Sequence, residues 1–151
     1  MKLRPLMEVS RGRAEVVIGL IDGPVAANHE DLANTNISAV PGRTGSACVR
    51  ADSTACLHGT FVAGILSARR ASGCAGYLSR LHSAGAADLS ESSDQNPDMP
   101  SAAPEELAAA IIDCVDAGVK VINLSAALVQ PSLKGLRFLE EALDYAATIT
   151  S

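Results

Sequence analysis

The sequence predicts an α/β fold in which a parallel sheet is flanked by helices. Two observations support this prediction. Residues 16–22, VVIGLID, are a continuous apolar run of the kind that forms a strand buried on both faces. Further along the chain, strand-like runs alternate with patterns typical of helices, which is the order that gives a parallel sheet. A length of 151 residues fits one domain.

The first half of the chain has one clear strand and one clear helix. Gly23 and Pro24 break the strand at 16–22. No periodicity is visible over 26–56, so this stretch is predicted to be a loop with at most a short strand. A helix is predicted over 58–70. The residues expected on its apolar face are Phe61, Val62, Ile65 and Leu66.

The second half contains the clearest helix, at 101–117. Pro104 suits its first turn, and Gly118 is placed to end it. A strand, VKVINL, is predicted at 119–124, and another helix over 132–147. The expected core-facing residues are Leu107, Ile111 and Val115 in the first helix and Leu136, Leu139 and Leu143 in the second, with Ser132 as the cap of the latter.

The segment at 73–98 does not fit this pattern. It has no stable period, and it lies where an α/β chain needs a strand between two helices. A structureless loop of this length is unusual inside a compact domain.

Composition argues against several classes of protein. Aromatic residues make up 3% of the chain, which is too few for a platform that stacks bases. The net charge of -5 is unfavourable for binding a phosphate backbone. No stretch approaches the run of about 20 apolar residues that crosses a bilayer. We therefore expect neither a nucleic-acid partner nor a membrane partner.

The four cysteines, at positions 48, 56, 74 and 114, form no C-x-x-C motif. The N-terminal residues lack the apolar stretch of a signal peptide, so we expect a cytoplasmic protein with reduced thiols. Pairing of Cys48 with Cys56, or a metal bound between them, stays open as an alternative. No cofactor is expected, and no metal site is assigned.

Two short motifs carry the chemistry. Asp22 ends the first strand within IGLIDGPV, and His58 begins the predicted helix within LHGTFVAGIL. A carboxylate just beyond the end of a buried strand lies where α/β proteins place their sites. If it meets a histidine, it fixes the imidazole tautomer and leaves the second ring nitrogen as a general base. We therefore expect Asp22 and His58 to be catalytic.

These motifs resemble those of the subtilisin-like serine proteases, the subtilase or peptidase S8 family. LIDGPV, HEDL, HGTFVAGIL and VINLSAAL match the family's motifs in order and spacing, from about Val16 to Ser72 and from about Met99 to Ala147. The Asp-Gly-Pro variant is most similar to the cytoplasmic members that mature ribosomal peptides, the cyanobactin (thiazoline peptide) group. The resemblance implies a three-layer α/β/α fold and peptide-bond hydrolysis through an acyl-enzyme.

The resemblance also implies a role for each matching residue. Asp22 would orient and stabilise the imidazolium, and His58 would act as general base and then as general acid. A peptide or protein substrate in extended conformation would pair with a substrate-binding strand. Gly59 and Gly64 would permit close helix packing. The residues that match the substrate-binding strand are Asn123, Ser125, Ala126 and Ala127.

The chain departs from the family after that strand. The family's nucleophile lies in a G-T-S motif and its oxyanion donor in an A-A-G-N motif, and neither motif occurs in the 151 residues. We therefore interpret 1–151 as the N-terminal part of a peptidase S8 domain that is inactive as a peptidase on its own. A truncated sheet would expose its edge at 121–128, through which we expect self-association.

The family pattern also offers an explanation of the segment at 73–98. A shift of one base in codons for its first part can encode GAPAICPGCTLLVRPIFP, a loop that leads into a buried strand. We therefore interpret 74–98 as anomalous, with roughly 74–90 translated out of frame or changed by a sequence error. Resequencing of the coding DNA tests this hypothesis.

Two other classes of function stay open. One is a non-catalytic fragment that binds a peptide or a partner protein through the strand at 121–128. The other is a nucleotide- or phosphate-binding α/β domain that uses the loop after VVIGLID, although neither G-x-G-x-x-G nor G-x-x-x-x-G-K-[ST] occurs.

Overall fold

The computed structural model describes residues 5, 9, 13, 15–33, 35–41, 43, 48–67, 81–83, 101–128 and 132–149. Within these residues the strands are β1 (Ile18–Ile21), β2 (Ile37–Ala39), β3 (Leu81–Ser83), β4 (Ser101–Ala102), β5 (Val121–Leu124) and β6 (Ala127–Leu128). The helices are α2 (Thr54–Ser67), α3 (Pro104–Asp116) and α4 (Leu133–Ile149).

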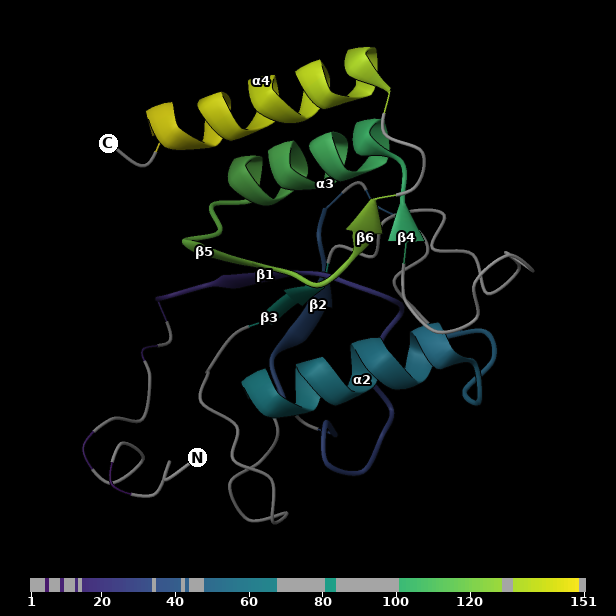
Figure 1. The fold of residues 1–151 in the computed structure, drawn as a ribbon. Helices are drawn as coiled ribbons and strands as arrows, with labels where there is room; N and C mark the ends of the chain where they lie inside the picture. Colours follow the sequence, from purple (N-terminus) through teal and green to yellow (C-terminus); the bar gives the residue numbers. More distant parts are fainter. Residues whose placement is uncertain are drawn as a thin grey trace.

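Four strands form a sheet in the order β2-β3-β1-β5. All three pairings in it are parallel, so the predicted α/β fold with a parallel sheet is confirmed. Ile18 of β1 lies opposite Leu81 of β3 on one side and Val121 of β5 on the other. Figure 1 shows α3 and α4 on one face of this sheet and α2 on the other, which makes three layers. A second, small sheet pairs β4 with β6 in parallel.

β1 is the predicted first strand, and all four of its residues are buried. Successive side chains of a strand point to opposite faces of the sheet. Ile18 and Leu20 accordingly belong to the apolar cluster on the α2 side, and Ile21 belongs to the cluster on the α3 side. Gly19 faces α3 as well, where an added Cβ would lie 2.9 Å from the Cys114 sulfur. β1 therefore joins the two cores of the molecule.

α3 follows the predicted helix closely. Pro104 is its first residue, and the Glu106 carboxylate accepts a hydrogen bond from the Ala103 N–H at 2.9 Å. Gly118 follows the helix with a φ of 76°, a left-handed conformation that favours glycine. The predicted core stripe is confirmed, because all three of its members are buried: Leu107, Ile111 and Val115.

α4 is also confirmed as a helix, but its buried face differs from the predicted one. The Ser132 hydroxyl oxygen accepts a hydrogen bond from the Gly135 N–H at 2.9 Å, as expected of a cap. Leu139 packs against the core, whereas the prediction for Leu143 is wrong, because this residue is 54% exposed. The two buried residues of α4 are Gly135 and Ala142. Their small size lets α4 lie close to α3.

α2 departs most from the prediction. It begins at Thr54 rather than at His58, because the Ser53 hydroxyl oxygen accepts a backbone N–H of the first turn at 3.2 Å. The predicted apolar face is wrong for Phe61, which is 67% exposed, and for Ile65, which is also exposed. The helix instead buries small residues, which bring its backbone close to the sheet: Cys56, Gly59, Ala63 and Ser67, with Val62 and Leu66 partly buried beside them.

Some predictions fall partly outside the described residues. Of the segment 73–98, the structure describes only β3, whose backbone forms the strand between β2 and β1. Positions 68–70, at the end of a predicted helix, lie outside the described residues too. In the predicted loop at 26–56, β2 is the short strand that the sequence allowed for.

A helix that spans a membrane needs about 20 consecutive, mostly apolar residues, and the helices in the described part of the chain are α2, α3 and α4. None of them is long and apolar enough to cross a membrane.

Candidate active site

Asp22 follows β1 at the carboxyl end of the central strand, and its side chain is fully buried. Its Oδ1 atom accepts a hydrogen bond from the Gly23 N–H at 2.6 Å. The same oxygen lies 2.7 Å from Nδ1 of His58. The structure therefore brings together the two residues that the sequence analysis singled out, although 36 positions separate them in the chain.

His58 lies in the second turn of α2, with its side chain 29% exposed. An ionised carboxylate can only accept hydrogen bonds, so Nδ1 carries the proton of this contact. The Nε2 atom is then the ring nitrogen that can take a proton from another group. This arrangement can perform general base catalysis on a group that reaches the exposed side of the ring.

Two glycines make this contact possible. A Cβ on Gly23 would lie 2.2 Å from the Ala55 carbonyl oxygen, and a Cβ on Gly59 would lie 2.3 Å from the Gly23 carbonyl oxygen. The start of α2 therefore packs backbone against backbone on the segment after Asp22, as expected for Gly59. The same expectation is wrong for Gly64, where an added Cβ has no neighbour within 4 Å in the described part of the chain.

The environment of Asp22 opposes its charge. Burial raises the pKa of the Asp22 carboxyl above its usual value, while hydrogen bonds from His58 and the Gly23 N–H lower it. The smallest of the opposing effects comes from the Ser125 hydroxyl. Among the described residues, the Oδ2 atom of Asp22 has no hydrogen-bond partner. A cation at the His58 ring would therefore stabilise the ionised form of this buried carboxylate.

The predicted substrate-binding residues run past the same end of β1. Asn123 lies in β5 opposite Leu20, and the Ser125 N–H donates a hydrogen bond to the Ile21 carbonyl oxygen at 2.9 Å. The Ser125 hydroxyl donates to Oδ1 of Asn123 at 3.2 Å. All four residues are at least partly exposed: Asn123, Ser125, Ala126 and Ala127.

The structure divides the predicted strand at 121–128 into β5 and β6, and one edge of β6 is already occupied. Ala127 of β6 is paired in parallel with Ser101 of β4. An extended peptide that pairs with β6 on that edge must separate β4 from β6. This pairing could not be predicted from the sequence, because a two-residue strand has no periodicity of its own.

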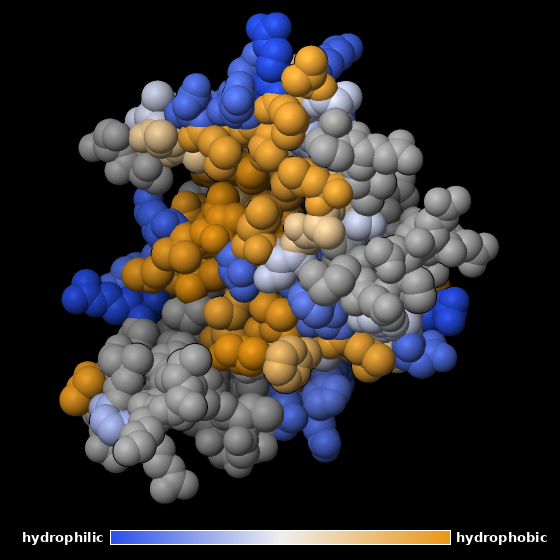
Figure 2. All heavy atoms as spheres, viewed as in Figure 1, coloured by the Kyte–Doolittle hydropathy of each residue, from blue (hydrophilic) through white to orange (hydrophobic). Residues whose placement is uncertain are grey.

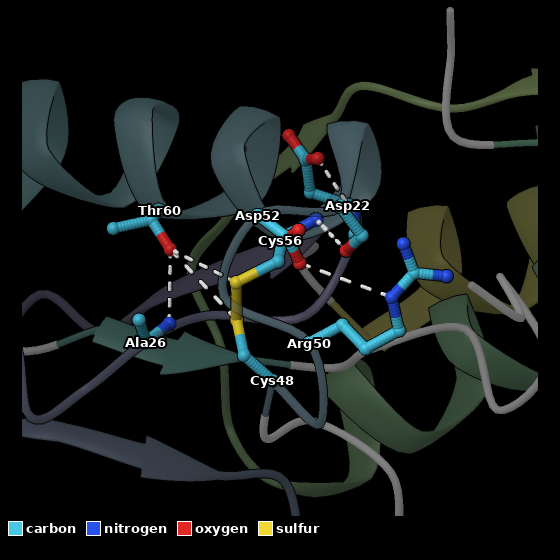
Figure 3. Close-up of a disulfide and its surroundings, with 9 residues drawn as sticks. Asp22, Ala26, Cys48, Arg50, Asp52, Cys56 and Thr60 are labelled. Carbon is cyan, nitrogen blue, oxygen red and sulfur yellow. Dashed lines mark hydrogen bonds and ion pairs between the residues drawn. A yellow bond between two sulfur atoms is a disulfide. The ribbon is translucent and has the colours of Figure 1, made fainter. Parts of the chain in front are cut away.

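The prediction of reduced thiols is wrong for Cys48 and Cys56, which form a disulfide with a Cα–Cα distance of 5.6 Å (Figure 3). Capping by Ser53 starts α2 early enough to place Cys56 in its first turn, facing the loop that carries Cys48. A spacing of eight residues did not indicate this geometry. Cys114 is a free thiol as expected, and burial raises its pKa to about 11. Cys74 lies outside the described residues.

Nothing in the described part of the chain completes a catalytic triad. No hydroxyl group of these residues forms a hydrogen bond with the His58 ring. In the same residues, no group of three or more His, Cys, Asp or Glu side chains could hold a metal ion. The arrangement is thus a carboxylate and an imidazole beside the end of β5 and the residue that follows it, which carry the partly exposed polar side chains of Asn123 and Ser125.

Comparisons with known proteins give one family. The peptidase S8 model, described as the subtilase family, matches residues 13–149. No curated protein sequence matches the chain.

Several solved structures have a similar fold. The prenylagaramide maturation protease PagA is 21% identical with a TM-score of 0.70, over 97% of this chain and 47% of PagA. A mutant of the protease domain of PatA is 22% identical with a TM-score of 0.71, over 92% of this chain and 48% of that domain. The nisin leader peptidase NisP from Lactococcus lactis is 19% identical with a TM-score of 0.60, over 96% of this chain and 44% of NisP. The chain therefore spans about half the length of the proteases that it matches.

Proposed function

The chain belongs to the subtilase family, and from this premise we propose that residues 1–151 supply the Asp and His of a serine endopeptidase site. The observation that carries this proposal is the 2.7 Å contact between Asp22 Oδ1 and His58 Nδ1. Burial of the carboxylate and partial exposure of the ring support it, because a general base needs one protected and one accessible nitrogen.

Each residue has one task in the proposed reaction. Asp22 holds the imidazole in the tautomer with the proton on Nδ1 and stabilises the imidazolium that forms. His58 takes the proton of an attacking serine through Nε2 and returns it to the leaving amine of the substrate. Both steps depend on the backbone contact between Gly23 and Gly59, which supports the position of α2 against Asp22.

We propose a peptide in extended conformation as the substrate, bound along Asn123, Ser125, Ala126 and Ala127. The hydrogen bond from the Ser125 N–H to the Ile21 carbonyl oxygen supports this, since it holds the strand beside Asp22. Similar structures belong to proteases named for leader-peptide processing or for maturation of prenylagaramide and patellamide. By that analogy the substrate is the precursor of a ribosomally made peptide, cut by a protease of the cyanobactin maturation group.

The nucleophile is the missing component. No serine of the 151 residues stands in a G-T-S context, and the A-A-G-N motif of the oxyanion donor is absent as well. We therefore propose that these residues alone do not hydrolyse peptides and that a segment with both motifs completes the site.

A second candidate function is a binding module without catalysis. It is supported by β5, the last strand of the sheet order, which pairs on one side only within the described residues, where Val121 is 50% exposed and Leu124 is also exposed. Figure 2 shows a band of apolar atoms on the face that carries α4, α3 and the sheet. Such an edge can add a strand from a peptide or from a second copy of the chain.

We also propose the cytoplasmic location expected from the sequence. The Cys48–Cys56 disulfide is the observation that tests it, because disulfides in that compartment are rare and are mostly redox-sensing or catalytic. Thiol alkylation in freshly lysed cells, followed by mass spectrometry of both cysteines, measures how much disulfide is present. A fully oxidised pair in growing cells would contradict a cytoplasmic location.

Complementation tests the protease function. The 151-residue chain is mixed with a polypeptide that carries the serine-bearing half of a similar protease, and a fluorophosphonate probe reports an activated serine. We expect no labelling of either part alone and labelling of the mixture. His58→Ala should reduce the labelling rate by about 10³-fold or more.

Two outcomes would contradict the proposal. One is labelling of the 151-residue chain alone, and the other is labelling of the mixture at the same rate with His58→Ala. A binding module is favoured if a peptide binds the β5 edge with equal affinity in the unmodified chain and in the variant.

A further inference from the structure

Thr60 joins three segments of the chain through one hydroxyl group. Its Oγ1 atom accepts a hydrogen bond from the Ala26 N–H at 2.9 Å. The same atom lies 4.0 Å from the Cys48 sulfur and 3.9 Å from the Cys56 sulfur. Sulfurs of a disulfide carry no hydrogen, so only the hydroxyl can donate in these contacts. In Figure 3, dashed lines join the Thr60 hydroxyl to the Ala26 nitrogen and to both sulfurs of the disulfide.

These contacts involve residues that flank Asp22 and His58 in the sequence. On α2, His58 lies in the sequence between Cys56, in the first turn, and Thr60, four residues after Cys56. On the other side, Ala26 follows Asp22 by four residues. The hydrogen bond from Ala26 to Thr60 therefore fixes the turn that carries the imidazole against the segment that carries the carboxylate. A hydrogen bond of 2.7 Å weakens steeply when its partners move apart or tilt.

We propose that Thr60 and the Cys48–Cys56 disulfide are positioning elements for the Asp22–His58 pair, and that reduction of the disulfide loosens the pair. The catalytic meaning of this inference rests on the proposed protease function. The physical effect on the His58 ring does not, because the ring can be observed without a nucleophile.

A dithiol can reduce the Cys48–Cys56 disulfide by thiol–disulfide exchange. A thiolate of the dithiol attacks the sulfur of Cys48, which is half-buried, rather than that of Cys56, which is 1% exposed. Cys56 leaves as a thiolate in the first turn of α2, where the positive end of the helix dipole stabilises it. The second thiol of the dithiol then breaks the mixed disulfide and releases Cys48. Two electrons and two protons pass to the cysteine pair, and the dithiol becomes a disulfide.

The loss of the covalent bond has a local consequence. The loop that carries Cys48 is no longer tied to the first turn of α2. A thiol of Cys48 or Cys56 can donate a hydrogen to Thr60 Oγ1 and compete with the Ala26 N–H. Both changes release the turn that holds His58.

The test reads the His58 ring in the oxidised chain and after treatment with dithiothreitol. Nitrogen-15 NMR measures solvent exchange of the Nδ1 proton, and diethyl pyrocarbonate measures the reactivity of the ring. We expect both rates to rise at least threefold on reduction. Thr60→Val should raise them in the oxidised chain, and Thr60→Ser, which keeps the hydroxyl, should restore them.

Matched cysteine variants identify the thiols responsible. Cys48→Ala should have the faster His58 rates with and without dithiothreitol, whereas Cys114→Ala should keep the full response to reduction. Equal His58 rates in the oxidised and reduced chain would overturn the inference. So would a reduction that also melts α3 and α4, seen in their amide signals, because the disulfide would then stabilise the whole fold.

The outcome is separable from that of the complementation experiment. If the chain gives labelling in the complementation experiment but its His58 rates do not change on reduction, the protease function is supported and this inference is wrong. A chain that does not complement but whose ring responds keeps the positioning elements without the protease function. If Thr60→Val does not fold, the comparison of the oxidised and reduced unmodified chain still decides.

Discussion

The two faces of the sheet are built differently. On one face, α3 and α4 bury leucine, isoleucine and valine side chains in a continuous apolar cluster. On the other, α2 buries Cys56, Gly59, Ala63 and Ser67, while Phe61 and Leu57 face outward. The α3–α4 face is held by burial of apolar area. The α2 face has a smaller apolar cluster, to which close backbone approach, a cap and a disulfide are added, and it carries His58.

The Asp22–His58 pair therefore lies on the face with the smaller apolar cluster. Apolar packing contributes about 25 cal/mol for each Å² removed from water and requires no particular orientation of polar groups. A dyad with an interatomic distance of 2.7 Å requires fixed positions, which small residues and covalent or hydrogen-bonded ties supply. Substitutions in the two regions should therefore have different consequences.

The largest effect is expected in the α3–α4 core. Leu107→Ala should lower the free energy of unfolding by about 3 kcal/mol, because this side chain is 2% exposed and its loss leaves a cavity. Urea denaturation measures the change. Leu133→Ala is the matched control, since Leu133 is exposed, and it should cost less than about 0.5 kcal/mol. Similar costs for both variants would contradict the assignment of stability to this core.

The next effect separates steric contact from helix propensity on α2. Gly59→Ala should lower the free energy of unfolding by about 2 kcal/mol and disturb the His58 ring signals, because its Cβ meets the Gly23 and Pro24 carbonyl oxygens. Gly64→Ala should raise that free energy by up to about 1 kcal/mol, since a Cβ there is unobstructed and alanine favours the helix. Thermal unfolding and NMR of both variants test this. The same sign of change in both would show that close approach at Gly59 is unimportant.

Asp22→Asn should raise the free energy of unfolding at neutral pH, whereas Leu107→Ala and Gly59→Ala should lower it. Because burial raises the folded pKa of Asp22 above its usual 3.8, the stability linked to this group is present below pH 3.8 and is lost as the pH rises through the folded value. The variant should therefore be more stable than the unmodified chain at pH 7, by on the order of 1 kcal/mol. Urea denaturation of both proteins at pH values from about 3.5 to about 7.5 measures this difference in the free energy of unfolding, which should shrink as the pH falls. A variant that is less stable at neutral pH would contradict the unfavourable burial of this charge.

The smallest effect on unfolding is expected at the open edge of the sheet. Val121→Lys should change the free energy of unfolding by less than about 0.5 kcal/mol, because this side chain is half exposed. It should nevertheless weaken self-association of the chain, since a charge on an edge strand opposes pairing. Sedimentation equilibrium of both proteins measures this. An unmodified chain that stays monomeric at all concentrations would contradict self-association through this edge.

The apolar half of the fold could be predicted because it follows simple periodicities. β1 was found from its continuous apolar run, and α3 from a stripe with a proline at its start and a glycine beyond its end. Polar interactions between distant segments leave no periodicity in the sequence. Arg43 forms an ion pair with Asp113, and Tyr145 donates a hydrogen bond to Asp116 at 2.7 Å, yet both partners lie far apart in the sequence.

The candidate site could be predicted only in part. Asp22 and His58 were found because a strand end and a helix start are places where side chains meet, and the family motifs identified the same residues. The start of α2 was missed, since the Ser53 cap stands in a stretch without periodicity. The disulfide and the contacts of Thr60 could not be predicted either, because they depend on which residues share the first turns of α2, and the start of the helix sets this.

The central position of β1 has a consequence for synthesis on the ribosome. β1 pairs with β5, about 100 residues further along the chain, whereas Asp22 and His58 are 36 positions apart. Contacts between distant segments form late, since a long loop must close first. β3, its other partner, is made earlier, but at about 5–20 residues per second the apolar β1 strand waits roughly 5–20 s for β5 to be made. The yield of folded chain should therefore depend on what shields that strand during translation.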